Sequence, residues 1–315
     1  MSQTEAQKDK RSAALSSVIA AVGLTSFKVI VGVLTNSLGI LAEAAHSALD
    51  LAAAAMTFFA VRVSDKPADR EHPFGHGKVE SISALFETLL LLATSAWIIY
   101  EAVHRLTATG VEVEVSIWSF IVMGTSIVID ATRSRILMRA AKKYNSQALE
   151  ADALHFSTDI WSSSVVILGL IGVLVARAFP GLAFLEKADA VAALVVAVIV
   201  IYVSGQLGMR SIQSLLDAAP LNGETDKIIE IVNALKEVSD VHSVRIRPSG
   251  AGWFVDMHVT MDGNLSLEES HTVTEKIETV VTGILPKSDV TVHVEPAEGR
   301  DDAKRAKRKA SPRTR

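Results

Sequence analysis

Cysteine is missing from this chain of 315 residues, so disulfide bonds and thiolate metal ligands are excluded. An excess of one charge is also missing. The 31 basic and 35 acidic residues give a net charge of −4, which says little about partners, and we expect no nucleic acid among them. There is no H-E-x-x-H string, the metal-binding signature of many metalloproteases. A polar stretch precedes the first apolar segment and no A-x-A site follows it closely, which argues against a signal peptide.

Apolar residues are abundant instead. They make up 49% of the chain, and the mean hydropathy of +0.33 is too high for an ordinary soluble domain of this length. They gather in windows that match the roughly 20 helical residues needed to cross a bilayer. The sequence therefore predicts six transmembrane helices, over Ala13–Leu34, Leu38–Val63, Ile82–Val103, Ile117–Met138, Asp152–Phe179 and Ala188–Leu207.

Lysine and arginine are unevenly distributed among the connections between these helices, and basic connections usually face the cytoplasm. The basic side comprises the N-terminal segment and the connections after the second and fourth helices. Its basic residues are Lys8, Lys10, Arg11, Arg62, Lys66, Arg70, Lys78, Arg133, Arg135, Arg139, Lys142 and Lys143. We therefore expect both termini to lie in the cytoplasm.

The pattern changes after residue 210. A helical period over 222–238 is followed by strand-like alternation over 241–248 and 252–261, a second helix that begins near Ser266, and a last strand over 288–296. The order α-β-β-α-β in about 85 residues is typical of a small ferredoxin-like α+β domain.

Four parts of the chain follow from these patterns. We expect a cytoplasmic N-terminal segment at 1–12, a six-helix transmembrane domain at 13–210, a cytoplasmic α+β metal-binding domain at 211–296 and a basic tail at 297–315. The tail contains a basic run at 304–309. We expect it to be a disordered, solvated segment, with contact to anionic lipid headgroups as the alternative.

One formula occurs twice in the predicted membrane helices: an acid, two residues, a histidine, three residues and an aspartate. Residues four apart share a face of a helix, so each histidine and its aspartate can be directed to one point. Two such helices side by side would supply two imidazoles and two carboxylates, which suit tetrahedral Zn²⁺ and balance its charge. The sequence thus predicts a metal site formed by His46, Asp50, His155 and Asp159.

A single motif of this kind could instead be a histidine–aspartate hydrogen bond that braces a bundle. The repeat in two spans favours metal, because ionisable residues inside a membrane are functional by default. The acids of the two motifs, Glu43 and Asp152, lie one turn earlier on the same faces. We expect them at the cytoplasmic mouth or around the ligands rather than on the metal. Asp130 is followed by Arg133 and Arg135, which predicts a structural ion pair.

Three stretches, "TNSLGILAEAAHSALDLAA", "HPFGHGKVESISAL" and "ADALHFSTDIWSS", resemble the signatures of the cation diffusion facilitator family over about residues 13–296. The resemblance implies a homodimeric divalent metal/proton antiporter of the bacterial inner membrane, with a metallochaperone-like cytoplasmic domain. It makes the two histidines and two aspartates the transport site. Manganese-type members have aspartate at the second histidine, and some iron/zinc members have aspartate at the first. Histidine at both positions favours Zn²⁺, with Cd²⁺, Co²⁺ or Fe²⁺ as alternatives.

The resemblance also assigns roles outside the spans. A loop site would consist of Asp69, His72 and His76, where Pro73 and Gly75 favour a turn. A zinc site in the cytoplasmic domain would draw on His242, His258, His271, His293 and Glu295, with the part of Asp256 left open. Lys78 and Asp217 would form a charge interlock between the membrane and cytoplasmic domains. The alternatives are histidines without metal and independent surface charges.

These patterns predict a secondary active transporter rather than an enzyme. Zn²⁺ would displace protons from the intramembrane site, the helices would rock, and a more acidic exterior would reprotonate the histidines, since imidazole titrates near about pH 6.5. Metal in the cytoplasmic domain would stabilise the dimer and regulate transport. A membrane metallohydrolase, a metal channel and a metal sensor without transport are the alternatives. Hydrolysis by the pure protein would indicate a metallohydrolase. Metal flux independent of a proton gradient would indicate a channel.

Overall fold

The computed structural model describes residues 3–107, 116–179, 185–219 and 223–297. Its contacts divide the chain into two compact units, with the boundary between Leu215 and Leu216. The basic run at 304–309 lies outside the described residues.

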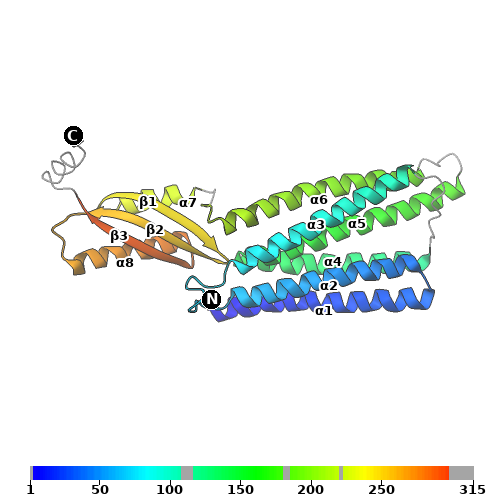
Figure 1. Ribbon diagram of the computed structural model, residues 1–315, viewed down its shortest axis with the longest axis horizontal. Coiled ribbons are helices and arrows are strands. Elements are labelled where there is room, and N and C mark those ends of the chain that lie inside the picture. The colour runs from blue at the N-terminus through cyan, green and yellow to red at the C-terminus, as the bar shows by residue number, and fades with distance from the viewer. Residues whose placement is uncertain (1–2, 108–115, 180–184, 220–222, 298–315) are drawn as a thin grey trace, which may run out of the picture. The chain divides into compact units, whose positions relative to one another are not determined.

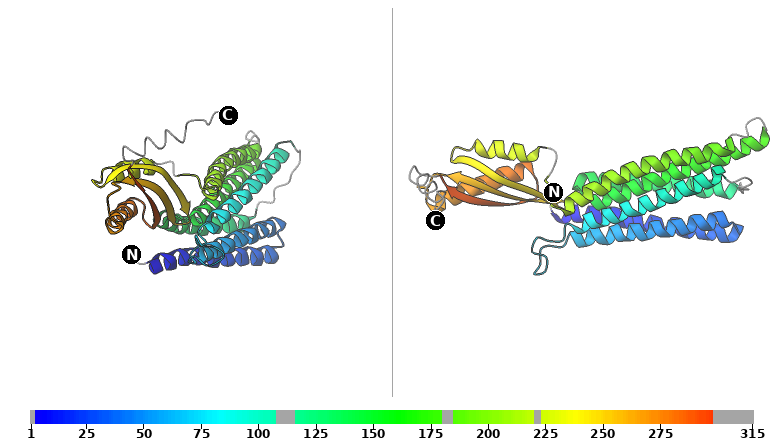
Figure 2. Two further views of the ribbon diagram at one scale, coloured as in Figure 1. Left: turned by 60° about the vertical axis from the view of Figure 1, so that its left-hand side comes forward. Right: turned by 45° about the horizontal axis from the view of Figure 1, so that its top comes forward.

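Six long helices form the first unit, and successive helices run in opposite directions (Figures 1 and 2). Helices are confirmed at all six predicted places. Their bounds are α1 (Gln3–Thr35), α2 (Leu38–Ser64), α3 (Val79–Thr107), α4 (Ile117–Tyr144), α5 (Gln147–Ala178) and α6 (Leu185–Leu215).

Membrane-spanning character is clearest in four of these helices. Among the described residues, α1, α2, α3 and α6 are long and apolar enough to cross a bilayer. Spans by α4 and α5 stay a prediction. In α4 the basic side chains gather in the second half of the helix, with two of them, Lys142 and Lys143, in the last turn. They lower its mean hydropathy even though 28 residues exceed the length a span requires.

Two tight turns set the borders of α2 and α5. Asn36 and Asn145 take left-handed backbone conformations, with φ of 50° and 51°, as asparagine does more readily than most residues. The serine after each asparagine caps the next helix: Ser37 accepts from the Ile40 N–H, and Ser146 from the Leu149 N–H. Consecutive helices are thereby held as antiparallel neighbours.

Small side chains let the helices of this unit approach closely. Ala54 of α2 and Ala148 of α5 are fully buried, together with Phe156 of α5 and Leu137 of α4. Small residues are typical of helix contacts in membranes, where packing replaces the hydrophobic effect. Large apolar side chains instead cover the outside, among them Leu34, Trp97, Val128, Trp161, Leu168 and Tyr202. This arrangement fits a bundle whose surroundings are lipid.

A buried charge network joins one end of four helices. Lys10 Nζ of α1 lies 2.7 Å from Asp65 Oδ1, at the end of α2, and 3.1 Å from Glu80 Oε1 of α3. Glu80 also accepts from Ser64 at 2.9 Å and from Ser146, the cap of α5. Glu80 and Lys10 are 1% and 4% exposed. The charges therefore compensate one another away from water.

The second unit contains α7 (Glu224–Asn233), β1 (Val238–Ser249), β2 (Gly252–Met261), α8 (Leu267–Ile284) and β3 (Ser288–Pro296). This confirms the predicted α-β-β-α-β order. The three strands form one sheet in the order β1-β2-β3, in which β1 and β2 are antiparallel and β2 and β3 parallel. A capping box between Ser266 and Glu269 starts α8, as the sequence predicts.

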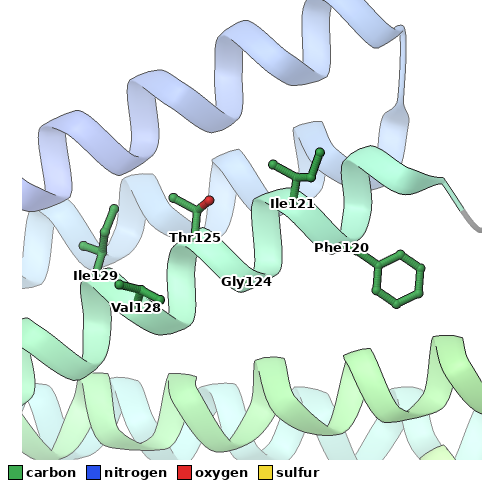
Figure 3. Close-up of a pocket in the computed structure, with 6 residues that line it drawn as sticks. All are labelled: Phe120, Ile121, Gly124, Thr125, Val128 and Ile129. Carbon is green, nitrogen blue, oxygen red and sulfur yellow. The ribbon is translucent and has the colours of Figure 1, made fainter.

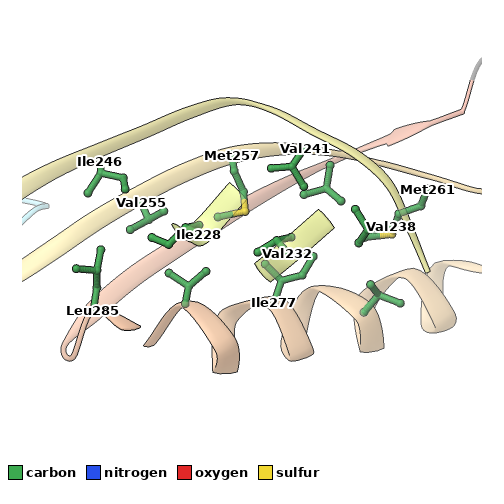
Figure 4. Packing of buried hydrophobic residues seen from close by; sticks show 13 residues of the cluster. Ile228, Val232, Val238, Val241, Ile246, Val255, Met257, Met261, Ile277 and Leu285 are labelled. Atoms are coloured by element: carbon green, nitrogen blue, oxygen red, sulfur yellow. The ribbon is translucent and has the colours of Figure 1, made fainter. Parts of the chain in front are cut away.

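Both helices of the second unit pack on one face of its sheet (Figure 4). Ile228 of α7 and Ile277 of α8 meet Val255, Met257 and Val259 of β2 in this core. The residues between them on β2 face the other way and are partly exposed. This alternation leaves the second face of the sheet free for polar side chains.

A shallow apolar groove of about 420 Å³ runs along α4 (Figure 3). Thr125 supplies the only hydroxyl among its lining side chains, which are Phe120, Ile121, Thr125, Val128 and Ile129 beside Gly124. None of the predicted ligands lines it, so the metal sites have to be sought elsewhere.

Candidate metal sites

The two intramembrane motifs meet at one point between α2 and α5. His46 and Asp50 lie on one face of α2, and His155 and Asp159 on one face of α5, as their four-residue spacing predicts. Ligand atoms of Asp50, His155 and Asp159 all lie within 4.8 Å of one another. The fold thus brings together side chains that are more than a hundred residues apart.

Direct contacts join all four side chains, which we call the transport cluster. His155 Nε2 lies 3.2 Å from Asp50 Oδ1 and 3.7 Å from Asp159 Oδ2. His46 Nε2 lies 3.8 Å from Asp50 Oδ1 and 3.9 Å from Asp159 Oδ1. A metal ion bound between them would replace these imidazole–carboxylate contacts by coordination. Two neutral imidazoles and two carboxylates would leave a bound divalent ion without net charge.

The surroundings of the transport cluster are polar and buried on one side. Asp130 of α4 forms the predicted ion pair with Arg133, at 3.2 Å. Arg133 also lies over the ring of Phe156, 3.4 Å from its centroid, and donates to Ser17 Oγ of α1. Ser17 in turn donates to Asp152 at 3.3 Å. Arg133 therefore fixes the groups next to His155 without touching a ligand.

Glu43 and Asp152 lie on different sides of the transport cluster along the bundle, and their expected place at the mouth or around the ligands stays a prediction. Because α2 and α5 run antiparallel, residues one turn before the two histidines lie towards opposite ends of the bundle (Figure 1). Glu43 is partly exposed and lies 3.2 Å from Lys28 Nζ of α1. Asp152 is fully buried. The motif is repeated in sequence, but its direction is reversed by the fold.

The loop cluster is built by the turn between α2 and α3. His72 Nδ1 and His76 Nε2 each lie 3.4 Å from a carboxylate oxygen of Asp69. Gly75, with φ of 78°, donates to the His72 carbonyl, and this turn holds the two imidazole rings 4.5 Å apart. Backbone N–H groups of His72 and Glu71 donate to Asp69 and hold the pKa of its carboxyl below the ordinary value. The carboxylate is therefore ionised and ready to bind a cation.

The third cluster lies on the open face of the C-terminal sheet. His242, His258 and His293 occupy one row across β1, β2 and β3. Glu295 Oε1 accepts from His258 Nδ1 at 2.8 Å, and Glu295 Oε2 lies 3.3 Å from His242 Nε2. The hydrogen bond from His258 and the nearby histidines lower the pKa of the Glu295 carboxyl. We call His242, His258 and Glu295 the sheet cluster, with His293 beside it at 3.8 Å from Glu295.

A β-bulge contributes to the sheet cluster. The register between β1 and β2 shifts by one residue after His242, where Ser243 takes a φ of 53°. His242 also lies 3.1 Å from Asp240, an acid that the sequence patterns did not single out. Asp240 and His242 are two residues apart on β1, so ordinary strand alternation places them on the same face and could have indicated this partner.

His271 is not brought to the sheet cluster within one chain. It lies on α8, which covers the opposite face of the sheet, and its Nε2 is 3.5 Å from Glu275. Asp256 lies on the face of His258 but one pair along the strand, where Arg245 approaches it at 3.7 Å. Neither side chain joins the ligand group that the structure forms.

Lys78 and Asp217 fall in different units. Lys78 donates to the Leu215 carbonyl at 3.3 Å, and Asp217 lies 3.6 Å from Arg247 of β1. Asp217 also has a left-handed backbone, with φ of 58°. Their charge interlock stays a prediction.

Two buried charges near the transport cluster were missed by the sequence patterns. Lys28 of α1 is 4% exposed and donates to Ser47 Oγ at 2.8 Å as well as contacting Glu43. Glu87 of α3 is fully buried and accepts from Thr57 of α2. Neither belongs to a repeated motif. The available signal was a single ionisable residue inside an apolar window, which marks a functional position in a membrane protein.

Fold and sites together define a class: a helical membrane protein with buried and exposed clusters of imidazoles and carboxylates arranged as ligands for divalent metal ions. Family models agree with this class. The one for a cation efflux transmembrane domain matches residues 14–216, and the one for the cytoplasmic domain of cation efflux proteins matches 220–297. The chain belongs to the cation diffusion facilitator family, as the motifs predict. It is a transporter for efflux of divalent metal cations.

Relatives match it over nearly the whole length. The cation-efflux pump FieF of Citrobacter koseri is 33% identical over 300 residues, which cover 94% of this chain and 95% of that protein. FieF of Cronobacter sakazakii is 32% identical over 284 residues, 90% and 92% of the two chains. The metal-bound C-terminal domain of the CzcD transporter from Thermotoga maritima is 32% identical, with 24% of this chain and 91% of that one covered and a TM-score of 0.23.

Proposed function

We propose that this transporter exchanges Zn²⁺ for protons at the transport cluster by alternating access. The observation that carries the proposal is the mutual contact of two imidazoles and two carboxylates between α2 and α5. Nitrogen and oxygen donors in a four-member set suit Zn²⁺, whereas a set of oxygens alone would favour harder ions. Cd²⁺, Co²⁺ and Fe²⁺ are the competing substrates.

The same contacts explain how protons are coupled to the metal. Without metal, each imidazole can hold a proton against a neighbouring carboxylate, at the 3.2–3.9 Å separations of the cluster. Zn²⁺ needs the lone pairs of those nitrogens and so displaces the protons. Metal and protons therefore compete for one set of atoms. A site that opens alternately to each side then transports them in opposite directions.

Metal-driven proton flux in sealed proteoliposomes tests this proposal. Asp50→Ala or Asp159→Ala removes one carboxylate, and we expect the flux to be abolished in either variant. Asp9→Ala is the matched control, because it removes an exposed carboxylate of α1 that contacts Lys143 and lies outside the cluster. Flux like that of the unmodified protein in either cluster variant would contradict the proposal. Repeating the assay metal by metal ranks the substrates.

The sheet cluster supports a regulatory role for the C-terminal domain. We propose that Zn²⁺ at the sheet cluster stabilises a homodimer in which both termini face the cytoplasm. The loop cluster is a weaker site, since its Asp69 and His72 side chains are about half exposed. The loop cluster and the sheet cluster differ from the transport cluster in being open to solvent. They can therefore respond to metal on one side of the membrane.

A further inference from the structure

Two buried carboxylates lie outside the transport cluster, and among the described residues neither has a basic side chain in direct contact. Glu87 of α3 and Asp152 of α5 are both 0% exposed. One oxygen of Glu87 accepts from the Thr57 hydroxyl, and Asp152 Oδ2 accepts from the Ser17 hydroxyl. In the part of the chain that the structure describes, their other oxygens, Glu87 Oε2 and Asp152 Oδ1, have no hydrogen-bond partner. Each carboxyl is thus half satisfied in a dry setting.

The two helices that carry these carboxyls, α3 and α5, pack against each other. Ala84 and Ala151 are fully buried in one cluster where these helices meet. Glu87 follows Ala84 by three residues and so lies on the same face of α3, while Asp152 lies in the turn of α5 that contains Ala151. The negative charges of Glu87 and Asp152 act on each other across this contact.

The charges around the pair come from α2, α4 and α5 itself. Arg133 of α4 reaches Asp152 through Ser17, with its Nη2 3.1 Å from the Ser17 hydroxyl. His155 acts on both carboxyls, and Asp50 of α2 acts on Asp152. Arg133 compensates about one negative charge and is itself paired with Asp130. A second negative charge on the pair is therefore left uncompensated.

A proton fits this position better than a metal ion does. A carboxyl out of water favours its neutral form, and two adjacent carboxyls cannot easily both ionise. A proton on Glu87 Oε2 or Asp152 Oδ1 neutralises the excess charge and supplies the missing hydrogen-bond donor. A divalent ion would instead meet the positive charge of Arg133 and only oxygen ligands from these two side chains.

We propose that Glu87 and Asp152 together hold one exchangeable proton at a site separate from the metal ligands. Asp152 lies one helical turn from His155, so the proton can pass between this pair and the transport cluster when the site changes its access. The exchange step rests on the proposed antiport. The existence of the site does not, because a carboxyl can be protonated in a protein that transports nothing.

Infrared spectroscopy of the full-length, metal-free protein tests the site itself. At about pH 7, where exposed carboxyls are ionised, we expect the C=O stretching band of a protonated carboxylic acid. Glu87→Gln keeps the shape of the side chain and is expected to remove the band. Asp152→Asn removes the repulsion between the pair and is expected to move the band's pH midpoint to lower pH. Glu150→Gln, a partly exposed position on α5 near Arg210, is the control and leaves the band unchanged.

Counting protons in proteoliposomes tests the exchange. We expect Glu87→Gln to lower the number of protons exchanged per Zn²⁺ by about one while zinc still binds at the transport cluster. If Asp50→Ala kept full flux while Glu87→Gln lost the infrared band, the antiport proposal would fail and the proton site would stand. Persistence of the band in Glu87→Gln overturns the proton site. A loss of one zinc equivalent in that variant would also overturn it, because the pair would then bind metal.

Discussion

His155 differs from His46 in how deeply its side chain is buried in the bundle. The side chain of His155 is 5% exposed and that of His46 is 36% exposed, although both contact Asp50 and Asp159. A metal ion that loses a ligand can recruit water where water is present. The two histidines are therefore unequal as ligands, even though the sequence presents them in the same motif.

Alanine at either position measures this difference. We expect His155→Ala to lower Zn²⁺ affinity by about 100-fold or more and His46→Ala by less, about 10-fold. Competition with a zinc-binding dye on purified protein gives both values. The inequality would be wrong if the two variants lost affinity equally or if His46→Ala lost more.

Replacing His155 by aspartate tests the choice of metal. The change exchanges a nitrogen ligand for a third carboxylate, and oxygen ligands favour harder ions such as Mn²⁺ over Zn²⁺. We expect the ratio of Mn²⁺ to Zn²⁺ transport to rise about tenfold or more in His155→Asp. Asp130→Glu, which keeps a carboxylate beside Arg133, is expected to leave this ratio unchanged. An unaltered ratio of Mn²⁺ to Zn²⁺ transport in His155→Asp would show that this ligand does not determine the choice of metal.

The ligands of the transport cluster were predictable because helical spacing is a local property. Four-residue intervals fix which side chains share a face, and the repeat indicates that two faces meet. The partners Glu87 and Asp152 could not be derived in this way, because their approach depends on where α3 crosses α5.

At the scale of elements, the ends of the helices in the membrane unit are joined by charge. Glu80 is the centre of this network, with Lys10, Ser64 and Ser146 as its partners. Glu80→Ala would leave Lys10 buried with Asp65 as its remaining carboxylate. Because Lys10 keeps Asp65, we expect a loss of about 1–3 kcal/mol in stability, which is the cost of leaving the Ser64 and Ser146 hydroxyls without their acceptor.

Thermal unfolding in detergent checks this loss. Glu71→Ala, in the exposed connection before α3, is the control and is expected to change stability by less than about 0.5 kcal/mol. The interpretation is refuted if Glu80→Ala unfolds at the same temperature as the unmodified protein.

The core of the second unit depends on one face of α8. Ile277 is fully buried against the sheet, whereas Leu267 on the same helix is 88% exposed. Ile277→Ala leaves a cavity and is expected to cost about 2–5 kcal/mol. Leu267→Ala is expected to be nearly neutral. The two variants are compared by chemical unfolding of the full chain, monitored through hydrogen exchange of the β2 amides. Similar amide protection in both variants would contradict this core.

The first turn of α8 has its own pH dependence. Hydrogen bonds from the Ser266 N–H and hydroxyl hold the pKa of Glu269 below its ordinary value of 4.5. Because the pKa of Glu269 is depressed in the folded state, its ionised carboxylate contributes fully to stability above about pH 4.5. This contribution is lost as the pH falls through the pKa of the folded state. We expect protection of the first-turn amides to drop in that window, and to be independent of pH there in Glu269→Gln. Equal pH profiles would show that the capping box does not titrate.

Strand positions were predictable from alternation, but the register was not. The sequence places His242 at the start of the first strand, whereas β1 begins four residues earlier at Val238 and contains the bulge at Ser243. The bulge lies after His242, so it changes which later residues of β1 face the cluster but leaves Asp240 and His242 on one face. The row of three histidines depends on pairing between distant strands, which spacing along one strand does not determine.

For the whole molecule, the open question is whether metal at the C-terminal domain acts on transport. The sheet cluster is solvent-accessible, with side chains of His242, His258 and Glu295 that are 33–41% exposed. An accessible site equilibrates with free Zn²⁺, whereas His155 of the transport cluster is only 5% exposed. The two sites can therefore be saturated at different zinc concentrations.

His258→Ala separates regulation from transport, because it removes a sheet-cluster ligand and leaves α2 and α5 untouched. We expect the rise in rate caused by zinc on the C-terminal side to be lost and the rate at low zinc to be kept. His271→Ala is the matched control: it makes the same chemical change in the same domain, on the opposite side of the sheet, and is expected to retain the stimulation. Rates measured against zinc concentration in oriented vesicles distinguish the two. An unchanged zinc dependence in His258→Ala would restrict the sheet cluster to a structural role, because a site that sets the rate cannot lose a ligand without shifting the curve.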